Sequence, residues 1–219
     1  MRVLDHGSLD YIDHMGDDLF VVNRAKASYA KEALDLGHKE EKLIMFLAKH
    51  GHTSPFYHPK ITIRIHAPIS VQRQWYTHRI GVDNNSESTR YVTMKPQFYV
   101  PGILRKQSAV NKQGSEGLIE DTQNDICLNA MHRNYEYAIE LYNYLLDCGV
   151  AREQARDVLP LSTYTSWDST LSLYAAYNIY KLRTGEGAQE EIQEYAVALE
   201  QIVEPLFPLC WKELKEHHA

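Results

Sequence analysis

Cysteine is scarce in this sequence: only Cys127, Cys148 and Cys210 occur among 219 residues, and no two of them have CxxC spacing. An odd number of isolated cysteines argues against a disulfide framework or a zinc ribbon, and we expect buried thiols. No stretch approaches the roughly 20 consecutive apolar residues of a membrane span. The N-terminus is too acidic for a signal peptide. We therefore expect a cytoplasmic protein that does not bind a membrane.

A basic excess is also missing, because the formal net charge is -6. Proteins that follow a nucleic-acid backbone normally carry a positive excess, so we expect no nucleic-acid partner. Any phosphate must be held locally by a few side chains. Apolar residues make up 44% and charged residues 24%, which is typical of globular proteins. The length fits one domain over residues 1–219.

The hydrophobic pattern predicts an α+β fold with several helices around a small central sheet. Helices are predicted over residues 19–33 with Asp17 or Asp18 as N-cap, then over 40–50, 69–79, 121–147, 151–158 and 188–203. A further helix is predicted to start near Asp168 or Ser169 and to end at Gly185. Alternation over residues 61–66 predicts a half-buried strand, and residues 161–167 are predicted to be extended. Residues 51–59, 80–91 and 104–117 are predicted to form turns or ligand loops.

Cationic and small polar side chains are dense between Gln72 and Tyr91, where Arg73, His78 and Arg79 lie among amides and hydroxyls. Guanidinium groups bind phosphate oxygens well, and amides and hydroxyls can bind a sugar and a base. The composition is therefore typical of a mononucleotide site. It also fits a solvated polar loop after a helix.

Within this segment, THRIGVDNNSESTRY resembles the defining motif of the flavin-dependent thymidylate synthases, in which Arg-His-Arg is followed by Ser and then Arg-Tyr. GHTSPFYH, ARDVLPLSTYT and KLRTGEGAQEEIQEYA resemble three further elements of that family, in the same order. The resemblance implies methylation of dUMP to dTMP, with methylenetetrahydrofolate as carbon donor and FAD, reduced by NADPH, as hydride source. It also implies a homotetramer with shared active sites and no cysteine nucleophile.

The same resemblance assigns roles to individual residues, and it implies no metal. The dUMP-binding positions are Gln74, Glu87, Ser88, Thr89, Arg90, Arg156 and Arg183. The FAD-binding positions are Ser54, His78, Arg79, Asn85, Ser86, Ser172, Tyr174 and Asn178. The catalytic positions are Arg183, which would polarise the uracil ring, His52, which would lie near flavin and folate, and Ser88. Taken singly, each of these residues also fits a surface ion pair, a helix cap or a satisfied polar residue.

The sequence departs from the family pattern mainly on the flavin side. Thr77 stands where the motif has its first Arg, Tyr57 and Ser86 where Glu is common, Ser172 where Asn is expected, and Tyr174 where Arg is expected. Loss of two guanidinium groups predicts weak FAD binding, partly compensated if Tyr174 stacks on a flavin ring. Two alternatives follow from these departures: a flavin-independent, folate-dependent pyrimidine-nucleotide hydroxymethylase, or a catalytically silent nucleotide-binding homologue. Retention of the nucleotide-side residues argues against the silent homologue.

Overall fold

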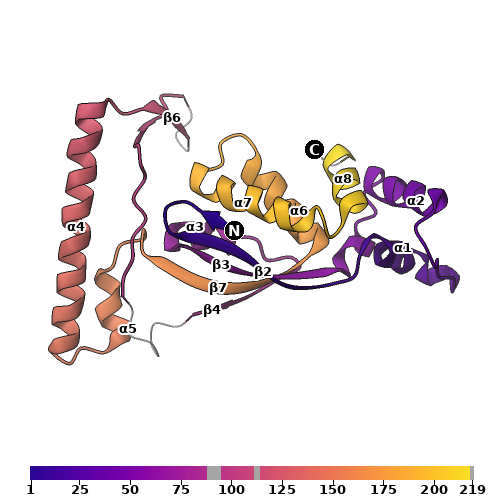
Figure 1. Cartoon of the computed structure of the whole chain (residues 1–219), viewed down its shortest axis with the longest axis horizontal. Helices are drawn as coiled ribbons and strands as arrows, with labels where there is room; N and C mark the ends of the chain where they lie inside the picture. The colour runs from indigo at the N-terminus through magenta and orange to yellow at the C-terminus, as the bar shows by residue number, and fades with distance from the viewer. Residues whose placement is uncertain (88–94, 111–113, 218–219) are drawn as a thin grey trace.

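The computed structural model describes residues 1–87, 95–110 and 114–217. Within them, one antiparallel sheet has the strand order β1-β2-β3-β7-β4 (Figure 1). Its strands are β1 (Arg2–Val3), β2 (Gly7–Met15), β3 (Lys60–Pro68), β4 (Val82–Ser86) and β7 (Tyr164–Ser172). A separate two-stranded sheet pairs β5 (Arg105–Gln107) with β6 (Ser115–Leu118).

The main sheet has one apolar and one polar face, because side chains alternate along each strand. On β3, Ile61, Ile63 and Ile65 are fully buried. The intervening Arg64 lies on the other face, opposite Asp168 of β7. The predicted half-buried strand is therefore confirmed. Its polar face is the surface on which a ligand can reach the sheet.

Helices pack around the apolar side of this sheet, with α6 and α7 lying together on one side in Figure 1. The helices of this part are α1 (Asp18–Lys26), α2 (His38–Lys49), α3 (Ile69–Trp75), α6 (Leu173–Thr184), α7 (Glu190–Val203) and α8 (Pro208–His217). The buried Asp18 carboxylate accepts hydrogen bonds from the backbone N–H groups of Leu209 and Cys210, at 2.9 and 3.0 Å. These bonds satisfy donors at the start of α8 and fix it against α1.

The longest helix, α4 (Asp121–Asp147), stands apart from the main sheet beside α5 (Arg152–Ala155) (Figure 1). Arg105 of β5 holds the adjoining small sheet to α7, because its Nη1 lies 2.7 Å from Glu190 and its Nη2 lies 2.8 Å from Glu191. Three short 3-10 helices complete the described elements: η1 (Ala27–Tyr29), η2 (Ser54–Tyr57) and η3 (Arg156–Val158). None of the described helices is long and apolar enough to cross a membrane.

The α+β class and the helix over residues 121–147 are confirmed, and Asp17 is the N-cap of α1. The predicted helix start near Asp168 or Ser169 is wrong. β7 continues to Ser172, because residues 164–172 pair with β3 along their whole length. The Ser172 hydroxyl then accepts a hydrogen bond from Ala175 N and caps α6.

Several other boundaries also differ from the prediction. The first helix ends at Lys26 and α3 at Trp75, both earlier than expected. The segment over residues 82–86 is an edge strand, and residues 7–15 and 208–217 form elements that the pattern did not indicate. Of the three cysteines only Cys210 is buried, so the expectation of buried thiols is wrong for Cys127 and Cys148.

Candidate functional site

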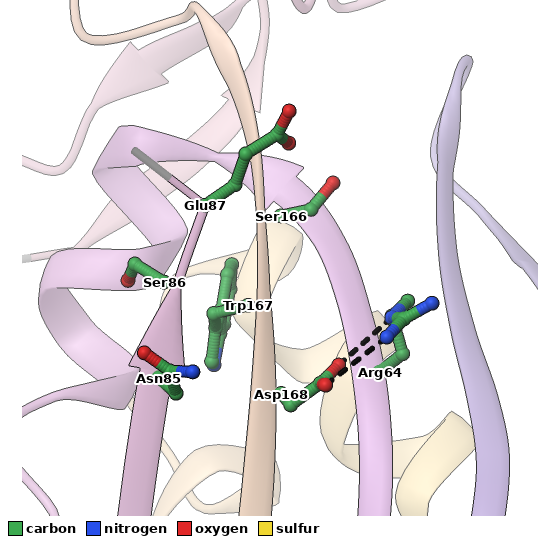
Figure 2. A pocket seen from close by; sticks show the side chains of 7 residues that line it. All are labelled: Arg64, Asn85, Ser86, Glu87, Ser166, Trp167 and Asp168. Atoms are coloured by element: carbon green, nitrogen blue, oxygen red, sulfur yellow. Dashed lines mark hydrogen bonds and ion pairs between the residues drawn. The ribbon is translucent and has the colours of Figure 1, made fainter. Parts of the chain in front are cut away.

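Ser86 and Glu87 line two neighbouring cavities. They belong to the segment THRIGVDNNSESTRY, of which the structure describes the residues up to Glu87. The first has a volume of about 400 Å³ and is shown in Figure 2. It is also lined by Arg64, Asn85, Ser166, Trp167 and Asp168. The second has a volume of about 570 Å³ and is also lined by Ile69, Gln72, Arg156, Asp157, Leu159, Thr163 and Thr165. Both volumes lie in the usual range of small-molecule sites.

Pairing between β4 and β7 fixes the positions of Ser86 and Glu87. Ser86 lies opposite Trp167 of β7, and the N–H of Glu87 donates to the Ser166 carbonyl at 2.9 Å. From α3, Gln72 Nε2 donates to the Ser86 hydroxyl at 3.1 Å, and the Tyr76 hydroxyl also bonds to it. Gln72 and Tyr76 are therefore site residues that the sequence reasoning missed, although both lie in the same polar segment. The predicted residues Ser88, Thr89 and Arg90 lie outside the described residues.

Two of the residues that line the smaller cavity, Arg64 and Asp168, form an ion pair on the polar sheet face (Figure 2). Arg64 donates two hydrogen bonds to the Asp168 carboxylate, at 2.8 and 3.0 Å. The bidentate pairing lowers the pKa of Asp168 and raises that of Arg64. This guanidinium is thus already occupied by an internal anion. Arg156, which begins η3, is a cation that lines the larger cavity.

A second cluster surrounds Arg183 near the end of α6. Its Nε donates to His78 Nε2 at 2.9 Å, and its Nη2 donates to the Thr77 hydroxyl at 2.8 Å and to the Gln74 carbonyl at 3.2 Å. Burial, followed by the positive charge of Arg183, lowers the pKa of His78 to about 4. His78 is therefore neutral at neutral pH and can accept this bond at Nε2.

The two clusters contact different parts of α3: Ser86 bonds to the Gln72 side chain, whereas Arg183 bonds to the Gln74 carbonyl and to residues that follow the helix. Successive helical residues are rotated by about 100°, so Gln72 and Gln74 point about 200° apart. Gln72 bonds to Ser86, whereas the Gln74 side chain donates to Gln189 at 2.5 Å. Within one chain, as far as the structure describes it, neither Gln74 nor Arg183 lines the cavity that contains Arg156. The predicted dUMP-binding residues are thus divided between two places.

Some of the predicted flavin-side residues form a third group, where η2 packs on α6, whereas Asn85 and Ser86 line the smaller cavity. The rings of Tyr57 and Tyr174 are 5.1 Å apart between centroids, so the two aromatic departures from the family pattern are direct neighbours. Asn178 follows Tyr174 by four residues and therefore lies on the same side of α6. Ser54 is exposed at the start of η2.

The remaining flavin-side predictions differ in exposure. His52 is exposed and stacks on Phe46 with 5.7 Å between ring centroids. Arg79 is exposed just beyond α3. Ser172 is fully buried, and its hydroxyl caps α6. His78 belongs to the Arg183 cluster rather than to the group around Tyr57 and Tyr174.

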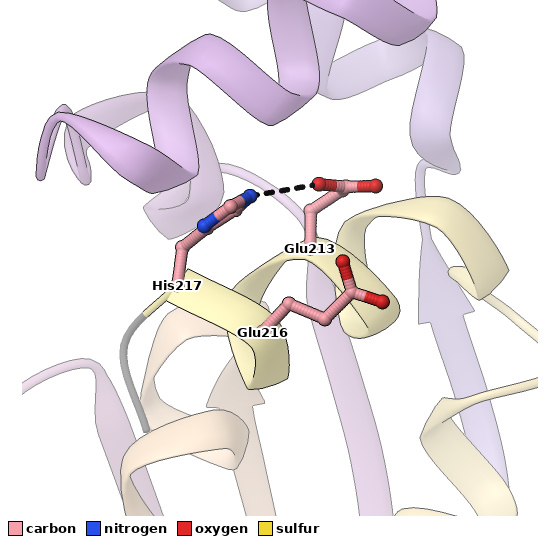
Figure 3. Close-up of side chains that lie close together, drawn as sticks. All are labelled: Glu213, Glu216 and His217. Atoms are coloured by element: carbon pink, nitrogen blue, oxygen red, sulfur yellow. Dashed lines mark ion pairs between the residues drawn. The ribbon is translucent and has the colours of Figure 1, made fainter.

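One group of potential metal ligands occurs in the described part of the chain: Glu213, Glu216 and His217 on α8, with ligand atoms within 4.8 Å of one another (Figure 3). His217 Nε2 lies 3.3 Å from the Glu213 carboxylate. Lys212 Nζ lies 3.6 Å from Glu213 and 3.8 Å from Glu216. Because the chain's own cations already pair with both carboxylates, we assign no metal to this group.

Comparison with known proteins gives consistent results. Residues 10–209 match the family model described as thymidylate synthase complementing protein. The chain is 38% identical over 207 residues to the flavin-dependent thymidylate synthase of Thermosipho africanus, covering 94% of this chain and 90% of that protein. It is 40% identical over 215 residues to the enzyme of the same name from Thermus thermophilus, covering 98% and 78%.

Among solved structures, the chain is similar to the UMP/dUMP methylase PolB from Streptomyces cacaoi bound with 5-Br dUMP. The TM-score is 0.87 at 31% sequence identity, and the match covers 99% of this chain and 97% of that one. The same methylase bound with 5-Br UMP matches with a TM-score of 0.85.

Proposed function

This chain belongs to the flavin-dependent thymidylate synthase family, and from that premise we propose that it methylates dUMP to dTMP with FAD, methylenetetrahydrofolate and NADPH. The observation that carries the proposal is the 570 Å³ cavity that places Arg156 beside Ser86 and Glu87. A guanidinium binds phosphate oxygens in a forked geometry, and the hydroxyl and carboxylate can receive donors of the sugar and base. The chemistry of this lining therefore suits a mononucleotide.

On the flavin side, the group around Tyr57 and Tyr174 suits a large planar cofactor. The neighbouring aromatic rings can contact such a ring, and Ser54 and Asn178 add polar groups close by. When bound, reduced FAD supplies the hydride of the reaction. The protein's own contribution is to bind and orient the reactants.

No thiol takes part in this proposal. Burial, followed by the neighbouring Asp18 carboxylate, raises the pKa of the Cys210 thiol well above its ordinary value. Cys127 lies on α4 and Cys148 is its C-cap, and in the described part of the chain no cysteine lines either cavity. Activation of the uracil ring therefore falls to Arg183, whose positive charge would stabilise negative charge that develops on the ring during reaction.

We also infer that the active site is completed between copies in a homotetramer. Arg156 lines the larger cavity together with Gln72, whereas Arg183 bonds to residues at the end of α3 and, in the described part of the chain, does not line that cavity. One nucleotide that binds both arginines would therefore take them from different chains. α4 supports assembly as well, because Ile126, Tyr137 and Tyr144 are each more than half exposed on it.

The proposal is tested by incubating the protein with dUMP, methylenetetrahydrofolate, NADPH and FAD and identifying the nucleotide product by mass. We expect dTMP, and we expect Arg156→Ala to raise the KM for dUMP about tenfold or more, since a charge-assisted phosphate contact contributes about 1.5 to 3 kcal/mol. Arg152→Ala is the matched control, because Arg152 is exposed one turn earlier on α5 and lines neither cavity. A hydroxymethylated product would favour the hydroxymethylase instead, and no product with intact dUMP binding would favour a silent homologue.

UMP is included as a second substrate in the same assay, because the similar structure PolB is a methylase of both UMP and dUMP. Turnover of UMP at a rate close to that of dUMP would extend the substrate range. Turnover of UMP alone would contradict the proposal.

A further inference from the structure

The residue at which the motif departs from arginine, Thr77, contacts the proposed catalytic arginine. The Thr77 hydroxyl donates to the Gln74 carbonyl at 2.7 Å and accepts from Arg183 Nη2 at 2.8 Å. A hydroxyl has one proton, so the bond to Gln74 fixes that proton and directs a lone pair at Arg183. The side chain is therefore in the orientation that an acceptor for Arg183 requires.

Three acceptors together hold one edge of this guanidinium. His78 Nε2 accepts from Arg183 Nε, while the Thr77 hydroxyl and the Gln74 carbonyl both accept from Nη2. All three acceptors come from the end of α3 and the residues just beyond it, so they are fixed to one another by a short piece of backbone. In the described part of the chain, Arg183 Nη1 makes no hydrogen bond, so one end of the fork remains available to a ligand.

We propose that Thr77 is a positioning residue, which orients the Arg183 guanidinium toward the nucleotide through its hydroxyl. This inference rests on the proposed role of Arg183 in the reaction. An arginine side chain has several rotatable bonds, and fixing it before the substrate binds removes part of the entropic cost of reaction. Thr77 thus has a function of its own in this chain.

The inference also predicts what happens when Thr77 is replaced by the arginine that the family motif has at this position. An arginine at position 77 would replace the hydroxyl that now accepts from Arg183. Arginine has no acceptor, so Arg183 would lose the hydrogen bond that the Thr77 hydroxyl now accepts. We therefore expect Thr77→Arg to lower the turnover of dUMP.

The test compares Thr77→Val, which keeps the shape of the side chain without its hydroxyl, with Thr77→Ser, which keeps the hydroxyl. Position 77 is exposed and lies outside the helix, so both variants should fold. We expect Thr77→Val to lower kcat about tenfold, which equals about 1.4 kcal/mol of transition-state stabilisation, with a smaller change in the KM for dUMP. Thr77→Ser should keep kcat within about twofold of the unmodified protein.

A second readout is independent of turnover. The Nε–H signal of Arg183 in proton–nitrogen NMR spectra, assigned by its loss in Arg183→Lys, should be sharp and protected in the unmodified protein and in Thr77→Ser. In Thr77→Val it should broaden or exchange faster with water, because one of the bonds that hold the guanidinium is gone. Thr77→Ala provides the same comparison if the valine variant is unstable.

The outcomes separate the two proposals. Loss of turnover in Arg183→Ala, with unchanged kcat and an unchanged NMR signal in Thr77→Val, would overturn the role of Thr77 and leave the proposed function intact. Full turnover in Arg183→Ala would overturn the catalytic role of Arg183, and with it the role of Thr77 in the reaction. A tenfold loss in Thr77→Val that Thr77→Ser restores, together with the broadened signal, supports the inference.

Discussion

Two inactive variants should restore each other's activity if one active site takes Arg156 and Arg183 from different copies of the chain. Arg156→Ala and Arg183→Ala each remove one charge-assisted contact, worth about 1.5 to 3 kcal/mol, so each variant alone should keep at most about a tenth of the normal kcat/KM. After random exchange of subunits at equal amounts, each residue of a given site is intact with a probability of about one half. About a quarter of the sites then contain both arginines. That level stands clearly above the remaining activity of either variant.

The assay mixes the two purified variants, allows their subunits to exchange under mild conditions and measures dTMP formation at dUMP concentrations well below the KM of the unmodified protein, where the rate reports kcat/KM. A reciprocal control mixes unmodified protein with the double variant Arg156→Ala/Arg183→Ala. About a quarter of its sites remain intact if the arginines come from different chains, and about a half if one chain supplies both. No restoration in the first mixture, together with half activity in the second, would refute the division of the site between copies.

Three further predictions concern single contacts. Arg183→Gln should raise the pKa of His78 above about 4, but not to its ordinary value, because burial is the larger cause of the shift and remains. NMR titration of His78 in both proteins measures this change, and an unchanged pKa would argue against the contact. Tyr174→Ala should weaken FAD binding several-fold in a fluorescence titration, whereas Tyr174→Phe should leave it nearly unchanged, since a stacking contact needs the ring and not the hydroxyl. Equal affinity of the two variants for FAD would remove Tyr174 from the site. Arg105→Ala should lower the free energy of unfolding, measured by urea titration, by about 2 to 3 kcal/mol, because the largely buried Glu191 would lose its ion-pair partner. A change below about 0.5 kcal/mol would show that water replaces that partner.

Much of the fold follows from local pattern. The helix over residues 121–147 is recognisable because its apolar residues repeat at helical spacing, and the strand with Ile61, Ile63 and Ile65 because alternation marks one buried face. The edge strand over residues 82–86 has mostly exposed polar side chains, so its pairing with β7 leaves no such pattern in the sequence. The boundary at Ser172 was misplaced because Asp168 and Ser169 have the composition of a helix cap, while tertiary pairing with β3 extends the strand beyond them.

The family resemblance proposes a set of site residues, which stays a prediction, but it says nothing about how those residues are arranged. Family resemblance identified Arg156, Arg183 and Tyr174, yet the sequence gives no sign that Tyr57 contacts Tyr174 or that Thr77 binds Arg183. These contacts join segments about a hundred residues apart, and no local rule relates such positions. Departures that look independent in the sequence are therefore neighbours of other site residues in the folded chain.

The dependence of dUMP methylation on flavin is tested most directly by one anaerobic single-turnover measurement. The protein is loaded with FAD, reduced with NADPH, freed of excess NADPH and given methylenetetrahydrofolate, and the flavin absorbance is followed as dUMP is added. We predict that the oxidised flavin spectrum returns only when dUMP and the folate are both present, and that one dTMP forms for each flavin oxidised. Formation of dTMP or of a hydroxymethylated nucleotide while the flavin remains reduced would contradict the proposed function.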